Sequence, residues 1–210
     1  MFHGLQGAGN GEFLVRFGCG AETTLMSDLV SLSPLALEYH VDALQQVYRA
    51  TPAYWQMYNL SGSPAGQAAR DLEAAAATPG RTLVGIVRRQ TTDEGETAVE
   101  LIGLVDFRMH WPQQGTAYIG MLMVAEPYQR RGIGTQAWQL LMPWLAQSAQ
   151  ISQARLGIEQ FNAGSLKFFQ GLSCVPTGET HRIQVGEKWI RLLYMERDLQ
   201  VSPDIPENKE

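Results

Sequence analysis

The sequence predicts a mixed α/β domain, on two observations. The chain has 210 residues, 45% hydrophobic and 18% charged, which is enough to bury one core. Helical and strand patterns alternate along it in the order β-α-α-β-β-β-α-β-α-β-β, without internal repeat or linker. We therefore expect a single α/β domain over residues 26–200.

The first part of the chain is predicted to be mainly helical. Alternating apolar residues favour a strand over 28–33, and Pro34 then suits the first turn of a helix that runs to about Ala50. A short aromatic-rich helix is expected over 53–58. An alanine-rich helix is expected over 63–77, because alanine has the highest intrinsic helix propensity.

The rest of the chain is predicted to be mainly strands. Period-2 patterns and turn residues place strands at 82–89, 98–109, 116–124 and 154–161, and a closing hairpin at 175–185 with 189–198. Helices are expected over 132–150 and 162–171. Pro143 lies inside the first of these and should kink it near Gln139, because proline lacks the amide proton of a helix hydrogen bond.

Both ends of the chain are expected to be loose. Residues 1–25 are rich in glycine and lack the basic start and apolar stretch of a secretory signal, so we expect a cytoplasmic protein. Residues 201–210 form an acidic tail. No run of about 18 apolar residues exists, so no membrane span is expected.

Charge and metal-ligand spacing narrow the function further. A net charge of −5 argues against binding to nucleic acid, which needs a concentrated basic face. Cys19, Cys174 and the four histidines are scattered without metal-ligand spacing. We therefore expect neither a nucleic-acid partner nor a metal.

The segment from Leu122 to Thr135 carries the most specific chemistry. An apolar strand passes through a short loop into a helix whose first turn holds Gly132 and Gly134. Amides at a helix start lack partners within the helix, and the helix dipole adds partial positive charge there. Glycines leave room for a diphosphate to reach those amides. The segment matches neither a P-loop nor a Rossmann fingerprint.

This segment resembles the coenzyme A loop of the GNAT superfamily of acetyl-CoA-dependent N-acyltransferases. The resemblance extends from about Leu29 to Leu199, and 154–174 is similar to the next strand–helix unit of that family. The part from Pro52 to Gly80 resembles a bacterial subgroup without a settled substrate. The resemblance to the GNAT superfamily implies a mixed, mostly antiparallel central sheet of six to seven strands, flanked by about four helices.

The resemblance also implies a binding site for acetyl-CoA as co-substrate. Backbone groups of Leu122, Met123 and Val124 are expected to pair with the pantetheine arm. The diphosphate is expected on the loop and helix start, at Gln129, Arg130, Arg131, Gly132, Ile133, Gly134 and Thr135. The following unit contributes the matching positions Asn162, Ser165, Phe168 and Phe169.

The acid and base of the reaction are less defined by the sequence. In that family, a tyrosine that acts as the general acid for the departing thiolate commonly stands where this chain has Phe169. Tyr194 or a water molecule is therefore the alternative proton donor. Glu159, Asp106 and Tyr118 are the candidate bases. Each has a structural alternative: a solvated strand residue, an ion pair with an arginine, and a packing residue, respectively.

The acceptor is expected to meet an aromatic cluster of Tyr54, Trp55 and Tyr58, which can stack on a cationic amine. Aromatic residues at helical spacing are equally typical of a core. The function expected is direct acetyl transfer to a primary amine of a small molecule or peptide. The alternatives are an acetyl-CoA-binding module without transferase activity and a purely structural domain. The closing hairpin also offers an edge for a homodimer.

Overall fold

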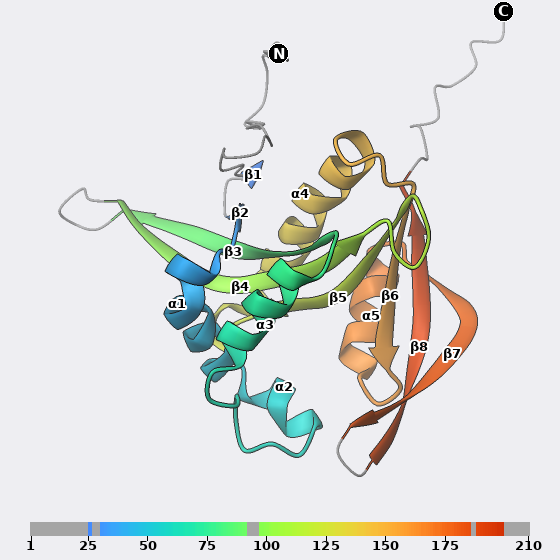
Figure 1. Cartoon of the computed structure of the whole chain (residues 1–210), viewed down its shortest axis with the longest axis horizontal. Coiled ribbons are helices and arrows are strands. Elements are labelled where there is room, and N and C mark those ends of the chain that lie inside the picture. The colour runs from blue at the N-terminus through green and yellow to red at the C-terminus, as the bar shows by residue number, and fades with distance from the viewer. Residues whose placement is uncertain (1–24, 27–29, 92–96, 186–187, 200–210) are drawn as a thin grey trace, which may run out of the picture. The chain divides into compact units, whose positions relative to one another are not determined.

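The computed structural model describes residues 25–26, 30–91, 97–185 and 188–199, shown in Figure 1. The elements are β1 (Leu25–Met26), β2 (Ser31–Pro34), α1 (Leu37–Arg49), α2 (Pro52–Met57), α3 (Gln67–Ala77), β3 (Arg81–Thr91), β4 (Thr97–Met109), β5 (Thr116–Val124), a 3-10 turn η1 (Glu126–Tyr128), α4 (Ile133–Gln147), β6 (Gln153–Glu159), α5 (Ala163–Gly171), β7 (Val175–Val185) and β8 (Lys188–Asp198). The predicted loose ends lie outside this set, apart from Leu25.

The strands form one mixed sheet in the order β1-β2-β3-β4-β5-β6-β8-β7. β5 and β6 run parallel, whereas β6 pairs antiparallel with β8 and β8 with β7. The predicted mixed, mostly antiparallel α/β class is therefore confirmed. Within the described residues there are eight strands and five α-helices. The two-residue β1 at the edge is the strand that was not expected, whereas α2 corresponds to the short helix expected over 53–58.

The start of the first helix differs from the prediction. Pro34 is the last residue of β2, in register with Val84, and the Leu35 amide still donates to the Leu83 carbonyl over 2.9 Å. The strand pairing therefore continues through the proline, and α1 begins only at Leu37. A proline that suits the first turn of a helix also suits the end of a strand near the edge of the sheet.

The alanine-rich helix also starts later than predicted. It was expected from residue 63, but the Ser63 hydroxyl accepts a hydrogen bond from Gln45 Nε2 over 3.2 Å. Gly66 then adopts a φ of +68°, and α3 begins at Gln67. Likewise α4 ends at Gln147, before the predicted end. Pro143 lies inside it as expected, and a kink there stays a prediction.

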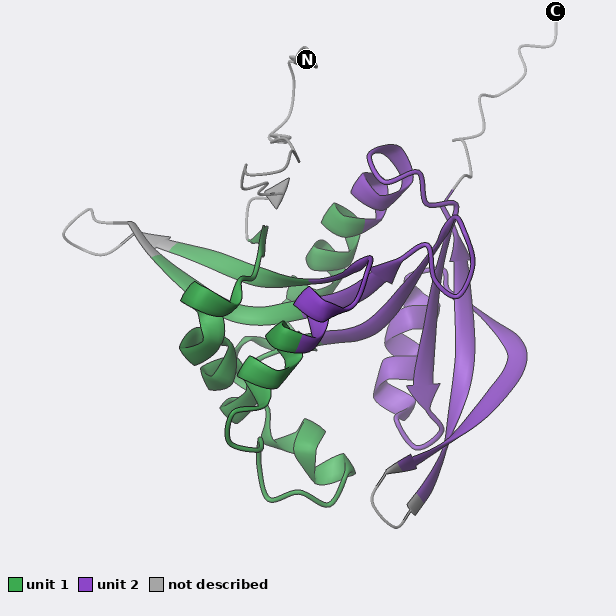
Figure 2. Ribbon diagram, in the orientation of Figure 1, with its two compact units in different colours: residues 1–73, 83–104, 123–141 green, residues 74–82, 105–122, 142–210 purple. Residues whose placement is uncertain are grey.

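Residue contacts divide the chain into two compact units, coloured separately in Figure 2. Unit 1 holds residues 1–73, 83–104 and 123–141, and unit 2 holds residues 74–82, 105–122 and 142–210. A single domain over 26–200 stays a prediction. None of the described helices is long and apolar enough to cross a membrane.

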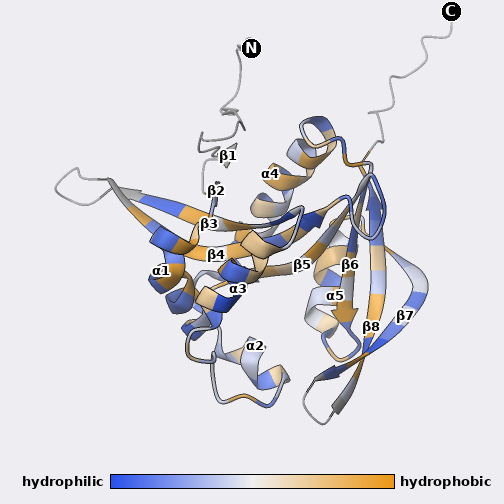
Figure 3. Cartoon of the chain, viewed as in Figure 1, coloured by the Kyte–Doolittle hydropathy of each residue, from blue (hydrophilic) through white to orange (hydrophobic). Residues whose placement is uncertain are grey.

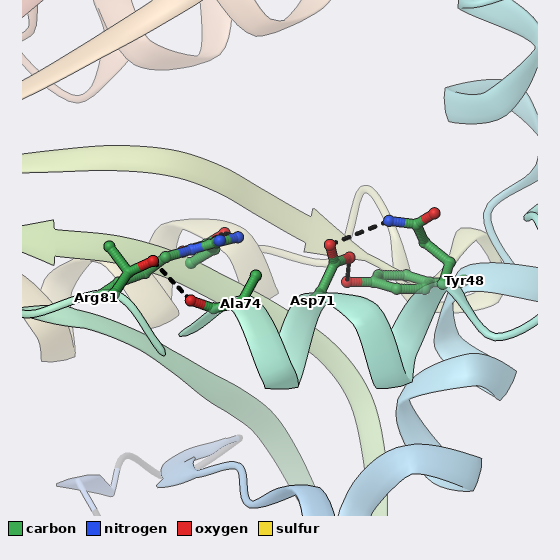
Figure 4. Close-up of polar contacts among 7 residues, drawn as sticks. Tyr48, Asp71, Ala74 and Arg81 are labelled. Carbon is green, nitrogen blue, oxygen red and sulfur yellow. Dashed lines mark hydrogen bonds and ion pairs between the residues drawn. The ribbon is translucent and has the colours of Figure 1, made fainter. Parts of the chain in front are cut away.

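In unit 1, α1 is anchored to α3 by a buried tyrosine. Leu44, Val47 and Tyr48 lie on the buried side of α1, at the spacing of one helical face. The Tyr48 hydroxyl donates to Asp71 Oδ2 over 2.7 Å, and Gln67 Nε2 donates to Asp71 Oδ1 over 3.0 Å (Figure 4). The hydrogen bond between Tyr48 and Asp71 thus joins the two helices.

In unit 2, the sheet has one buried and one half-exposed face. On β6 the side chains of Ala154, Leu156 and Ile158 are buried, whereas those of Arg155 and Glu159 are half-buried. This alternation follows from the period of two of a strand. Figure 3 shows that β8 also carries both hydrophilic and hydrophobic residues. The half-exposed face carries most of the candidate catalytic side chains.

Candidate active site

The loop between β5 and α4, in unit 1, is bent by two residues with left-handed backbones. Arg130 has a φ of +61° and Gly132 a φ of +78°, with an ordinary negative φ at Gln129. Turns that contain left-handed residues can direct successive amide groups toward one side, as a concave nest that binds an anion. We refer to residues 130–132 as the candidate anion-binding nest. Only glycine adopts the left-handed conformation without cost, which explains the glycine at 132.

The amides of the nest and of the first helical turn can hold an anion. The first hydrogen bond of α4 runs from the Gln136 amide to the Gly132 carbonyl over 3.0 Å, so the four preceding amides have no acceptor within the helix. The Gln129 amide, in contrast, already donates to the Glu126 carbonyl. Arg130 and Arg131 are exposed beside these groups and add positive charge.

Two side-chain contacts hold this loop in place. Gln129 Nε2 donates to the carbonyl of Val124, the last residue of β5, over 2.8 Å. The Tyr128 hydroxyl donates to Glu100 Oε1 over 2.6 Å, and this hydrogen bond raises the pKa of the Tyr128 phenol. The Arg131 guanidinium lies 5.9 Å from the Tyr128 ring centroid, so a cation–π contact also supports the loop.

The same loop touches the start of α2. Glu126 Oε1 accepts a hydrogen bond from the Ala53 amide over 2.8 Å, and the Glu126 amide donates to the Ala50 carbonyl over 2.9 Å. A carboxylate at a helix N-terminus also complements the helix dipole. The segment that begins the loop therefore fixes the position of α2.

The aromatic cluster of α2 is split between the core and the surface. Trp55 is only 6% exposed, and its indole N–H donates to the Tyr48 carbonyl over 2.8 Å. Trp55 therefore takes the core role that was the alternative for this cluster. Tyr54 and Tyr58 are half-buried and pack edge to face, 5.3 Å apart.

In unit 2, β5 and β6 pair over only part of their length. The registered pairs run from Thr116↔Gln153 to Ile119↔Leu156. β5 continues past Ile119, while β6 pairs with β8 on its other side as far as Glu159↔Leu192. The two parallel strands therefore part after Ile119 and Leu156 and leave backbone groups of Gly120 to Leu122 without β6 as a partner.

Tyr118 lies at the point where these strands part. Its hydroxyl oxygen is 2.9 Å from the position of an ideal Cβ on Gly157, so the absence of a side chain at Gly157 makes room for it. Burial and the neighbouring Tyr194 raise the pKa of the Tyr118 phenol to about 12, with a smaller contribution from Glu159 and an opposing one from Arg155. Tyr118 is thus protonated at neutral pH and is suited to donate a hydrogen bond.

Asp106 forms an ion pair with Arg81. Arg81 Nε lies 3.0 Å from Asp106 Oδ1, and an Arg81 terminal nitrogen lies 2.6 Å from Asp106 Oδ2. Both side chains are largely buried, at 25% and 14% exposure. Arg81 therefore engages both carboxylate oxygens of Asp106. The structural alternative for Asp106, an ion pair with an arginine, is therefore present.

The residues predicted around α5 have mainly structural contacts. Asn162 caps α5, because its Oδ1 accepts from the Ser165 amide over 3.1 Å. Phe169 is 8% exposed and packs edge to face with Phe168 at 5.0 Å. The position of the usual acid is thus occupied by a core side chain that has no proton to donate.

Sequence reasoning did not identify Arg155 and Gly157. Arg155 lies 4.3 Å from the Tyr194 ring centroid and forms ion pairs with Glu179 and Glu196. A charged residue between the apolar residues of β6 is a signal that could have indicated Arg155. The role of Gly157 depends on which residue faces it from β5, and that register is not visible in the sequence.

The described residues contain no group of three or more histidine, cysteine, aspartate or glutamate side chains placed to hold a metal ion.

Comparison with known proteins identifies the family. The model of the Acetyltransferase (GNAT) family matches residues 44–172, which is more than half of the chain. The chain therefore belongs to the GNAT family, and it is an acyltransferase of the acetyl-CoA-dependent N-acetyltransferase class. No curated protein matches the sequence significantly.

Solved structures agree with this fold. An acetyltransferase from Thermus thermophilus is 19% identical, with a TM-score of 0.61, over 81% of this chain and 97% of that one. An acetyltransferase from Salmonella typhimurium that modifies the N-terminal serine of a ribosomal protein is 17% identical, with a TM-score of 0.66, over 82% and 96%. The ribosomal α-N-protein acetyltransferase RimL in complex with coenzyme A is 17% identical, with a TM-score of 0.64, over 82% and 95%. At these identities the likeness shows the fold.

Proposed function

We propose that this protein transfers the acetyl group of acetyl-CoA directly to a primary amine of a small molecule or peptide. The observation that carries the proposal is the anion-binding nest at Arg130 and Gly132, followed by the open amides of α4, in a chain of the GNAT family. A diphosphate is the anion that such a helix start suits, and acetyl-CoA contains one.

Each part of the donor has a proposed binding site in the chain. The diphosphate binds the amides of Arg130 to Thr135. Gln129 contributes indirectly, because its amide already donates to Glu126 and its side chain holds the loop against Val124. The pantetheine arm pairs as an added strand with backbone groups of Leu122 to Val124. Asn162 and Ser165 line the same arm from the start of α5. When bound, acetyl-CoA supplies an activated thioester.

Glu159 is the proposed base. It is half-buried on the exposed face of β6, beyond the point where β5 leaves the strand, and its charge acts on Tyr118. Removal of the amine proton frees the nitrogen lone pair, which forms the new bond to the acetyl carbon as the carbon–sulfur bond breaks. The proton of the cationic amine passes to Glu159, directly or through water, and the electron pair of the broken bond leaves with sulfur. The nitrogen releases its second proton to water as the neutral amide forms.

The acceptor is proposed to bind near Tyr54 and Tyr58. These half-buried rings can stack on a cationic amine before it loses its proton. A peptide α-amine gains support as the acceptor class from the solved relative that modifies an N-terminal serine. Small amines remain the other class.

The test measures thiol release from acetyl-CoA with purified protein and a panel of small amines and peptides with free α-amines. Release that depends on one acceptor class supports the proposal and selects between the classes. Absence of release with every acceptor, from folded protein that binds acetyl-CoA, contradicts it.

A second candidate is an acetyl-CoA-binding module without transferase activity. It is favoured by Phe169, a buried side chain without a proton where the family commonly has a tyrosine. It predicts calorimetric binding of acetyl-CoA together with no acetylated product. The Glu159→Gln variant separates the two candidates. It should lower the rate of acetyl transfer if the protein is a transferase, and should change nothing if the protein only binds acetyl-CoA.

A homodimer and a cytoplasmic, bacterial setting are further proposals. β7 has β8 as its only neighbour in the described sheet, and Val175 and Trp189 in the terminal hairpin are 62% and 64% exposed. A second copy could cover these side chains. Light scattering of the purified chain, compared with the Trp189→Lys variant, tests the dimer.

A further inference from the structure

Tyr118 links the two strands at the closed end of the β5–β6 opening. The last registered pair of these strands is Ile119↔Leu156, and Gly157 is the next residue of β6. The Tyr118 hydroxyl oxygen lies 2.9 Å from an ideal Cβ built on Gly157. A phenol that belongs to β5 therefore reaches across to β6 where the strands begin to part.

The Tyr118 ring is held in position by its neighbours. Trp111 packs against it edge to face, with ring centroids 4.9 Å apart and an interplanar angle of 88°. Tyr194 faces Gly157 across the β6–β8 pair, and its Cε1 lies 3.3 Å from the same ideal Cβ. The hydroxyl is therefore preorganised rather than free to rotate away, which favours a role in stabilising charge.

The Tyr118 hydroxyl also carries its proton at neutral pH. Burial raises the pKa, and Tyr194 and Glu159 raise it further, because a second negative charge beside them is unfavourable. Arg155 acts in the opposite direction and does not overcome them. A protonated phenol in this position is a donor, not the base considered from the sequence.

We propose that Tyr118 donates a hydrogen bond to the thioester sulfur of bound acetyl-CoA and stabilises the departing thiolate. This inference rests on the proposed function. An extended chain that enters between two parting strands must stop where they pair again. The reactive end of the pantetheine arm is therefore expected beside Gly157, within reach of the Tyr118 hydroxyl.

Atoms and charges balance as follows in the proposed step. The deprotonated amine nitrogen forms its bond to the acetyl carbon, the carbon–sulfur bond breaks, and the electron pair goes to sulfur. The nitrogen then loses its excess proton to water and becomes a neutral amide. Tyr118 keeps its proton, because the pKa of a thiol is ~8.5, well below that of the phenol. The thiolate leaves as coenzyme A and takes a proton from solvent. Tyr118 thus replaces, by hydrogen bonding, the acid that Phe169 lacks.

The test compares the binding of coenzyme A with that of desulfo-coenzyme A, which lacks the sulfur. Titration calorimetry at about pH 9.5, where the thiol is ionised, is performed on wild-type protein and on Tyr118→Phe. The preference for coenzyme A is the ratio of the Kd for the desulfo compound to the Kd for coenzyme A. We expect this ratio to be roughly 10-fold or more lower in Tyr118→Phe than in the wild type, because hydrogen bonds to charged groups are strong. Affinity for the desulfo compound should be nearly unchanged.

Two further variants complete the design. Tyr39→Phe removes the hydroxyl of a tyrosine that is 82% exposed on α1 and should leave the preference intact. Gly157→Ala keeps the phenol of Tyr118 but adds a Cβ only 2.9 Å from its hydroxyl oxygen, so the hydroxyl must move. This variant should lower the preference as Tyr118→Phe does. The Gly157 variant also keeps the proposal testable if Tyr118→Phe fails to fold.

The outcomes separate this inference from the proposed function. An unchanged preference in both Tyr118→Phe and Gly157→Ala overturns the role of Tyr118 and leaves the function standing. Absence of binding of either compound to folded wild-type protein overturns the function itself, and the role of Tyr118 with it.

Discussion

The Gln129 side chain donates a hydrogen bond to the Val124 carbonyl over 2.8 Å, joining the loop back to the strand that precedes it. The contact spans the five residues in which β5 ends and the anion-binding nest begins. It fixes the direction in which the chain leaves β5, and through it the orientation of the amides at Arg130 and Gly132.

Loss of this contact should weaken donor binding. In Gln129→Ala the Val124 carbonyl loses its partner and the loop gains freedom. One neutral hydrogen bond contributes about 1 kcal/mol, so we expect the Kd for acetyl-CoA to rise about 5-fold. Calorimetry on this variant and on Gln139→Ala, an exposed glutamine of α4, checks it; equal affinities would exclude a role for Gln129.

A side chain at Gly132 should disrupt the nest. No atom lies within 4 Å of an ideal Cβ there, but a φ of +78° costs a residue with a side chain about 1 kcal/mol or more. We expect Gly132→Val to abolish acetyl-CoA binding while the cooperative unfolding of the protein persists.

The matched control is Gly171→Ala in α5, where an added Cβ also meets no atom within 4 Å and φ is not left-handed. It should bind acetyl-CoA like the wild type. If Gly132→Val also binds normally, the diphosphate does not lie on these amides.

Asp106 should prove structural rather than catalytic. Asp106→Asn removes the charge of a partly buried ion pair with Arg81 and should cost about 1–2 kcal/mol of stability. The Arg81→Gln variant should lose a similar amount, and the double variant less than the sum. Denaturant unfolding measures all three; a full loss of acetyl transfer with unchanged stability in Asp106→Asn would instead indicate a base.

Tyr118 should make the stability of the protein depend on alkaline pH. Its pKa is raised from 10.0 in its ordinary state to about 12 in the fold. The protonated phenol is thus favoured by folding, so its contribution is fully present below about pH 10 and is lost as pH rises toward about 12. Comparison of unfolding free energies of wild-type protein and Tyr118→Phe should show this difference, and parallel pH profiles would contradict it.

Cys174 should be inert in the folded protein. Burial raises the pKa of its thiol to about 11, although Arg197 acts in the opposite direction, and only the thiolate is reactive. We expect iodoacetamide to modify Cys174 at a rate set by unfolding, as followed by peptide mass spectrometry. Rapid modification under native conditions would show that the thiol is accessible and ionised.

The sequence predicted local features well. The strand over Thr116 to Val124 was placed correctly, because its apolar pattern ends at clear turn residues. The glycine at 132 was identified from its position at a helix start, and its left-handed φ supplies the physical reason. These features depend on residues close together in the chain.

Contacts between distant strands could not be predicted in the same way. Arg81 and Asp106 lie 25 residues apart, and only the strand order makes them partners. The contact of Tyr118 with Gly157 needs the register of a parallel pair whose strands are joined through α4. Trp55 shows a third limit, because the spacing of aromatic residues on a helix is the same for a core and for a binding surface.

The central claim is acetyl transfer from acetyl-CoA to a primary amine. Its most direct test is mass spectrometry of the acceptor, with simultaneous measurement of released thiol and with Gly132→Val as background. The account predicts one acetyl group gained by the amine for each thiol released, at a rate far above that of Gly132→Val. Acetyl-CoA binding with no acetylated amine above that background, across small amines and peptides, would contradict it.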